Sequence, residues 1–419
     1  MTVSAQELAR RLRTARNACR MRQEDVAGHL GLSRPAVVQM EAGRRSVSSL
    51  ELDRLAYLYG RQVGDFLAEG FEEEDTLVAL FRLHPELAED GAALEAARRS
   101  LQLGRAVSDL EGILGMDSAS VTPPSYRLPF PETKSAAVRQ GEQVAAEERR
   151  RLGLGVIPLP DMVELLEAQG VRTAQEELPA GVSGITLAEP SVGSFIVVNS
   201  GDAAWKQRFS FAHEYAHVLL DRPRPGILSR AEDRDTLPEV RANAFAASLL
   251  MPRRGVEQFM RHLAKGRASR ERSEVFDEEQ VQRTEERSAP GSQEIQVYDI
   301  ARLSHHFGTS GMTAVYRLRN LRLIGQSTME RLLEQENRNL GRRIARLLGL
   351  MPPDPERGAR AFQRRFLALG IEALRREAIS RAKLRELARL INTDEESLEQ
   401  ILDDVGLGQP PVDVELPAR

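Results

Sequence analysis

The chain has 419 residues, of which 41% are hydrophobic and 29% charged, so its length and composition predict several globular domains. The formal net charge of −4 excludes a uniformly basic nucleic-acid coat, although a local basic surface is compatible with that sum. The single cysteine, Cys19, excludes an intramolecular disulfide and a thiolate zinc site, so any metal site must use His and carboxylate ligands. The N-terminus is charged throughout and no stretch is apolar enough to span a membrane, so we expect a cytoplasmic protein without membrane contact.

Residues 1–70 are predicted to form an all-helical DNA-binding domain. A helix over 23–30, a Gly31-Leu32 turn and a second helix that starts after Ser33 have the spacing of a helix-turn-helix motif. Residues 1–45 contain nine arginines and four acidic residues, so the local charge is +5. Such a reversal of sign is typical of a DNA-binding surface, although a helical bundle with a solvated basic face would also show it.

We expect the second helix of this motif to enter the major groove, with Arg34, Ala36 and Gln39 toward the bases. Ser33 is the predicted N-cap of this helix and belongs to the same DNA-binding set. Gln23, Arg44 and Arg45 are expected to contact phosphate. The runs Q-E-D-V-A and G-L-S-R-P-A-V-V-Q-M-E-A-G resemble the XRE family of helix-turn-helix regulators. We therefore expect a duplex DNA operator as partner, bound by a homodimer on a two-fold site.

The rest of the chain is predicted to divide by composition and helical periodicity. A core with helices over 136–152, 160–170, 203–220 and 238–250 also contains a hairpin over 181–199. The expected divisions are a helical region with a Pro-rich linker (71–135), this core (136–263), a charged, exposed and mobile insertion (264–294), a helix-turn-helix-like helical support (295–335), a C-terminal helical domain (336–407) and a disordered tail (408–419).

The run His213-Glu214-Tyr215-Ala216-His217 lies in the helix predicted over 203–220. Residues four apart lie on one face of a helix, so both imidazoles can bind one Zn2+. Glu214 would lie beside a metal-bound water and take its proton during attack on a peptide carbonyl. A coincidental histidine pair on a buried helix is the alternative, but it leaves the costly burial of Glu214 unexplained.

A catalytic zinc ion needs a third protein ligand, and Glu239 is the first candidate. It lies on the same helical face as the apolar residues Ala242 and Ala246, where a carboxylate is expected only if it faces a cation. The alternative is a first-turn glutamate that is favoured by the helix dipole. If Glu239 is not the ligand, the next candidates are Glu232, Asp233 and Asp235.

The chain from 136 to about 325 resembles the ImmA/IrrE family of bacterial metallopeptidases. The resemblance rests on R-F-S-F-A-H-E-Y-A-H and E-V-R-A-N-A-F-A-A-S-L-L-M-P, with Tyr215-Ala216 where members often have Leu-Gly. It implies His213, His217 and Glu239 as zinc ligands and Glu214 as general base. We therefore expect a mostly α, multidomain protein: an all-α helix-turn-helix domain, an α+β zincin-like metallopeptidase domain with a small sheet, and a helical C-terminal region.

The resemblances together imply a regulator that cleaves an XRE-type repressor, either a partner or this chain itself, to control stress-response or mobile-element genes. One rival is a non-proteolytic transcription factor that senses a ligand through a peptidase-like domain, and another is a toxin–antitoxin component. The intact H-E-x-x-H motif argues against the first rival. His305-His306 is expected to be an exposed pair rather than a metal site, because adjacent side chains on a helix diverge.

Overall fold

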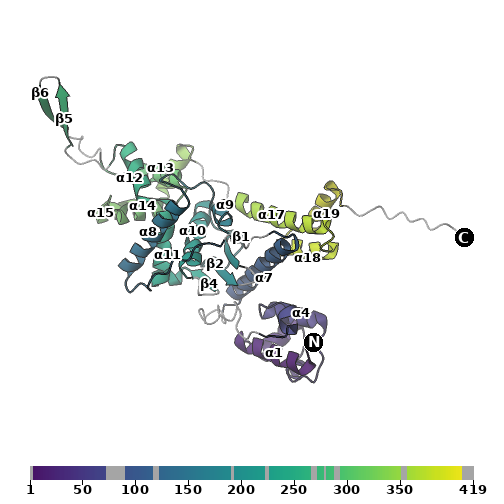
Figure 1. Ribbon diagram of the computed structural model, residues 1–419. Coiled ribbons are helices and arrows are strands. Elements are labelled where there is room, and N and C mark those ends of the chain that lie inside the picture. Colours follow the sequence, from purple (N-terminus) through teal and green to yellow (C-terminus); the bar gives the residue numbers. More distant parts are fainter. Residues whose placement is uncertain are drawn as a thin grey trace.

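The computed structural model describes nine stretches of the chain: residues 3–71, 90–116, 122–189, 193–221, 226–265, 271–277, 280–286, 293–350 and 356–407. The predicted tail over 408–419 lies outside them. Helices dominate, and one small mixed sheet lies near the middle of the chain, as expected for a mostly α, multidomain protein (Figure 1). None of the helices in these stretches combines the length and apolarity that a membrane crossing requires.

Five helices at the N-terminus form one unit, which is shown in purple in Figure 1 and is called the reader domain below (residues 3–71). Its helices are α1 (Ala5–Ala18), α2 (Gln23–Leu30), α3 (Arg34–Glu41), α4 (Ser49–Leu58) and α5 (Val63–Leu67). Gly31 ends α2 in a left-handed conformation with φ of 66°, which a side chain would disfavour, and the chain turns there into α3. Val37 and Met40 of α3 are each 1% exposed, as predicted for the core face of this helix.

A four-stranded sheet forms the centre of the second unit. Its strands are β1 (Val171–Glu176), β2 (Val182–Glu189), β3 (Gly193–Asn199) and β4 (Gly226–Arg230), in the order β1-β3-β2-β4. The predicted hairpin is the antiparallel pair β2–β3. Strand β1 runs parallel to β3, and strand β4 pairs with β2; neither strand was predicted from the sequence.

Helices cover both faces of the sheet, and the side chains of β3 are apolar on both faces. Ile196 and Val198 pack in one cluster with helices that include α8 (Lys134–Arg151), α9 (Met162–Glu167), α10 (Ala204–Leu220) and α11 (Leu237–Leu250). Phe195 and Val197 pack in the other cluster, with α7 (Gly91–Ile113) and α17 (Glu356–Arg375). That second cluster continues into the core of the reader domain, so α7 connects the reader domain to the sheet (Figure 1).

The remaining helices extend these two clusters. The cluster that contains α10 and α11 also includes five further helices, which are α12 (Arg253–His262), α13 (Val297–Phe307), α14 (Gly311–Asn320), α15 (Gln326–Asn337) and α16 (Leu340–Leu347). α16 contacts α13, so this body continues past residue 336, where we expected the C-terminal domain to begin. α17, α18 (Arg381–Leu390) and α19 (Glu395–Asp404) follow it.

The charged insertion expected over 264–294 contains regular structure where it is described. β5 (Glu271–Asp277) and β6 (Gln280–Glu286) form a two-stranded antiparallel sheet in which Phe276 lies opposite Val281. These β-forming residues favour strand pairing despite the charge around them. The hairpin projects away from the rest of the molecule (Figure 1).

Candidate metal centre and nucleic-acid interface

Three buried side chains from two helices meet at one point. His213 and His217 lie one turn apart on α10, and Glu239 lies in the first turn of α11. Oε2 of Glu239 lies 3.0 Å from Nε2 of His213, and Oε1 of Glu239 lies 3.2 Å from Nε2 of His217. The two Nε2 atoms are 3.2 Å apart. Within the described residues, this trio is the set of His, Cys, Asp and Glu side chains arranged to hold a metal ion.

Each histidine is oriented by a hydrogen bond at its other ring nitrogen. Nδ1 of His213 lies 3.0 Å from Oδ1 of Asn243, and Nδ1 of His217 lies 3.0 Å from Oδ2 of Asp221. A carboxylate only accepts, so a proton belongs on Nδ1 of His217, and Nε2 is the ring nitrogen that faces Glu239. Arg241 donates to the second oxygen of Asp221 at 2.7 Å and fixes that carboxylate in turn.

The charges of the three groups are coupled. Burial alone would lower the pKa of His217, but its hydrogen bonds to Asp221 and Glu239 outweigh burial and raise it from 6.5 to about 10. Burial alone would raise the pKa of Glu239, but hydrogen bonds from His213 and His217 hold it well below its ordinary value. The cluster therefore favours an anionic Glu239 and a cation beside it, and a metal ion that binds there must displace a proton.

Glu214 lies beside this cluster and is completely buried. Its Oε2 accepts a hydrogen bond of 2.6 Å from the hydroxyl of Thr186 on β2. Its Oε1 is buried without a hydrogen-bond partner among the described residues. The carboxylate packs so closely on β2 that a Cβ atom at Gly184 would lie 2.5 Å from Oε1, so only glycine leaves room for it there.

The donor set fits zinc. Two imidazole nitrogens and one carboxylate are a known protein ligand set for a catalytic zinc ion with one open position. Ligand atoms about 2.1 Å from one tetrahedral ion lie about 3.4 Å from each other, close to the separations of 3.0 to 3.2 Å among these side chains. The unpartnered Oε1 of Glu214 fits the same interpretation, because a buried carboxylate oxygen needs a proton donor such as water.

The other ligand candidates lie elsewhere. Glu232 and Asp235 belong to the exposed 3-10 turn η3 (Glu232–Asp235) and pair with Arg230 and Lys134. Asp233 of the same turn is not among the three clustered donors. His305 and His306 are exposed, as predicted, and His306 stacks on the ring of Phe259.

The residues that support the cluster were missed in the sequence, although two of them carry a signal. Asp221 follows His217 by four residues and Asn243 follows Glu239 by four, so helical spacing alone could have placed both beside the ligands. Thr186 and Gly184 lie on a strand that meets α10 only in the folded chain. No local spacing could have identified them.

The reader domain presents the predicted base-contacting residues on the outside of α3. Arg34 and Gln39 are exposed and Ala36 is half-buried. Ser33 occupies the N-cap position, although its side chain makes no capping hydrogen bond. Arg34 lies 3.9 Å from Glu24, and both side chains are more than half exposed, so this ion pair is weak and leaves Arg34 accessible.

Two of the predicted phosphate contacts already have partners within the reader domain. Arg45 makes a two-pronged ion pair with Glu51 at 2.6 and 3.2 Å. Gln23 donates to Glu41 at 2.9 Å, beside the buried ion pair between Glu41 and Arg16. Arg44 is exposed. The structure thus leaves Arg44 better placed than Arg45 or Gln23 to reach a phosphate.

Two known families match separate parts of the chain. Residues 7–68 match the family described as helix-turn-helix domain. Residues 166–319 match a peptidase family described as IrrE N-terminal-like domain, and this match contains the three candidate ligands His213, His217 and Glu239 as well as Glu214. No curated protein matches the chain.

Proposed function

Because the chain joins an XRE-type helix-turn-helix domain to an IrrE N-terminal-like peptidase domain, we propose that it is a transcription regulator that carries a zinc-dependent endopeptidase. Its substrate is an XRE-type repressor, either a partner or this chain itself, and its targets are stress-response or mobile-element genes. The observation that carries the enzymatic part is the convergence of His213, His217 and Glu239 beside the buried Glu214.

In this proposal His213, His217 and Glu239 hold the zinc ion, and Asn243 and Asp221 keep the imidazoles in position. Zinc, when bound, lowers the pKa of a water ligand to about 7 and polarises a carbonyl. Oε1 of Glu214 accepts the proton of the attacking water and later passes it to the leaving amine. Thr186 holds Oε2 of Glu214, so the carboxylate keeps one orientation through both transfers.

The zinc assignment is tested by metal analysis of the purified chain. The parent protein should contain about one zinc ion per chain. Glu239→Ala should lose zinc affinity and remain folded, whereas Glu232→Ala should behave like the parent because Glu232 is exposed and pairs with Arg230. Full zinc occupancy in Glu239→Ala would refute the role of Glu239.

The peptidase activity is tested by mass spectrometry of the zinc-loaded chain, alone and mixed with XRE-type repressors encoded beside it. New fragments should appear in the parent and be absent in Glu214→Gln, which keeps the helix and the ligands but removes the base. Zinc content without any Glu214-dependent cleavage would favour the rival function, a regulator that binds a ligand and does not cleave protein.

A further inference from the structure

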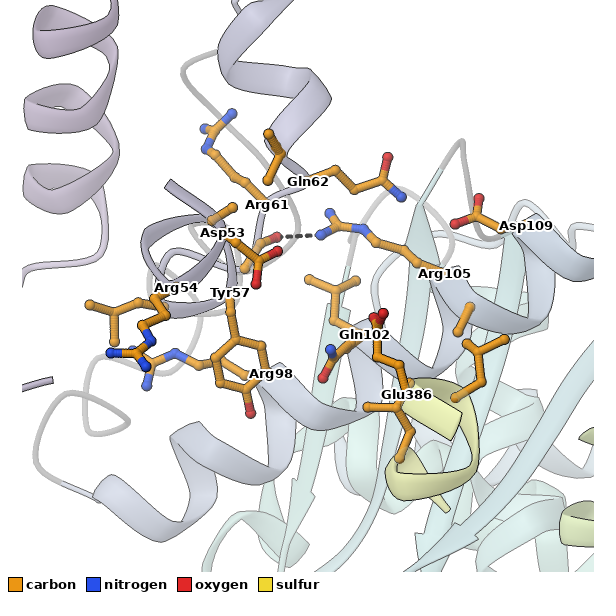
Figure 2. Close-up of a pocket in the computed structure, with 18 of the residues that line it drawn as sticks. Asp53, Arg54, Tyr57, Arg61, Gln62, Arg98, Gln102, Arg105, Asp109 and Glu386 are labelled. Atoms are coloured by element: carbon orange, nitrogen blue, oxygen red, sulfur yellow. Dashed lines mark hydrogen bonds between the residues drawn. The ribbon is translucent and has the colours of Figure 1, made fainter. Parts of the chain in front are cut away.

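A pocket of about 550 Å3 lies where three parts of the chain meet. The reader domain contributes α4 and the turn after it, α7 forms a second wall, and α18 closes the third side (Figure 2). The volume falls in the range of small-molecule sites, about 300 to 1,000 Å3. The pocket shares no residue with the candidate zinc site of His213, His217 and Glu239, so the proposed peptidase activity does not account for it.

The charged residues that line this pocket differ in solvent exposure according to their sign. Its three buried charged residues are all arginines: Arg61, Arg98 and Arg105. Its four acidic residues, by contrast, are all exposed: Asp53, Glu95, Asp109 and Glu386. The buried charges of the lining are therefore cationic, whereas its carboxylates are exposed to water, and this arrangement favours an anionic group beside the buried arginines.

Arg98 is the least compensated of the buried arginines. It is 4% exposed, its guanidinium lies 3.6 Å from Glu95, which is long for an ion pair, and it donates at 3.7 Å to the sulfur of Met21, which is a weak acceptor. Its Nε has no hydrogen-bond partner among the described residues, and burial lowers its pKa. A buried guanidinium with such weak partners is costly, and a carboxylate or phosphate is the group that best supplies the missing contacts.

Buried leucines supply an apolar part of the lining. Leu58 from the reader domain, Leu101 and Leu110 from α7, and Leu387 from α18 are all at most 4% exposed. Arg105 crosses from α7 to the reader domain and donates to the carbonyl of Gly60 at 2.6 Å, as the dashed line in Figure 2 shows. A molecule in this pocket would therefore contact the reader domain, α7 and α18 at once.

We propose that this pocket binds a small organic anion that combines an apolar body with a carboxylate or phosphate group. The anionic group pairs with Arg98, and the apolar body packs on the leucines of α7 and α18. The proposal does not depend on zinc or on peptidase activity. It assigns to the chain a ligand site at the joint between its DNA-reading domain and the helix that packs on the sheet.

The experiment is calorimetric titration of the full chain with octanoate, octyl phosphate and octan-1-ol. At least one of the two anions should bind saturably at one molecule per chain, and the better one identifies the preferred headgroup. Octan-1-ol should bind at least about tenfold more weakly, because it lacks the charge that Arg98 pairs with. Equal affinity for the alcohol, or no saturable binding of either anion at millimolar concentration, would overturn the proposal.

Three variants assign the binding to this pocket. Arg98→Gln should weaken anion binding about tenfold and leave octan-1-ol unaffected, and it should fold, because Arg98 has only weak partners. Gln102→Trp adds a large side chain to the pocket wall and should abolish binding of all three probes. Arg389→Gln removes an exposed arginine of α18 that does not line the pocket and should change nothing. Anion binding that survives Gln102→Trp would place the site elsewhere.

Discussion

Replacing Gly184 by alanine should disable the general base without touching a zinc ligand. The added Cβ would lie 2.5 Å from Oε1 of Glu214 and 2.8 Å from its Cδ and Cγ, and separations below 3.0 Å force a displacement. The backbone of β2 cannot easily retreat, because this strand pairs with β3 on one side and β4 on the other. The carboxylate of Glu214 must therefore move away from the position that Thr186 now fixes.

The expected magnitudes follow from that crowding. Overpacking a buried position costs about 1 to 3 kcal/mol of unfolding free energy. Displacing a general base should lower the rate of peptide cleavage about 10² to 10⁴-fold. The zinc content should equal that of the parent, since His213, His217 and Glu239 are not among the atoms nearest the added Cβ.

The assay combines urea unfolding, metal analysis and cleavage rate on Gly184→Ala. The matched control is Gly112→Ala on α7, where an added Cβ meets nothing within 4 Å. In the control, the helix should keep or gain about 0.5 to 1 kcal/mol, because alanine favours a helix more than glycine does. Parent-like stability and parent-like cleavage in Gly184→Ala would refute the assignment of Glu214 to this contact.

Three further predictions concern protons, metal affinity and DNA. In metal-free protein, protonated His217 stabilises the fold fully below pH 6.5, and this stabilisation should be lost as the pH rises to about 10. The melting temperature measured with a chelator present should therefore fall over this pH range. The melting temperature of zinc-loaded protein should not show this fall. Asp221→Asn should weaken zinc binding about 10 to 100-fold, whereas Asp235→Asn on the surface should not, and equal affinities would contradict the role of Asp221. In a DNA-binding titration, Arg34→Ala should lose about 1 to 3 kcal/mol of discrimination between sequences, whereas Arg44→Ala should weaken every sequence alike and reduce the salt dependence. If Arg44→Ala lost discrimination and Arg34→Ala weakened every sequence alike, Arg44 rather than Arg34 would contact the bases.

Features that depend on helical spacing could be predicted from the sequence. His213, Glu214 and His217 could be placed on one face because an α-helix repeats every 3.6 residues wherever it lies in a fold. The same periodicity located α2 and α3, and the Gly31 turn between them was recognisable from the residue type. These features are local, so the chain specifies them before any distant contact forms.

Contacts between distant residues depend on the packing of the folded chain. Gly184 and Thr186 contact Glu214 only because β2 packs on α10, and β1 joins the sheet only because it lies beside β3. Arg45 has the residue type of a phosphate contact, but the fold brings Glu51 to it. Contacts between segments far apart in sequence depend on how whole elements pack, and a spacing pattern within one element contains no information about its eventual neighbours.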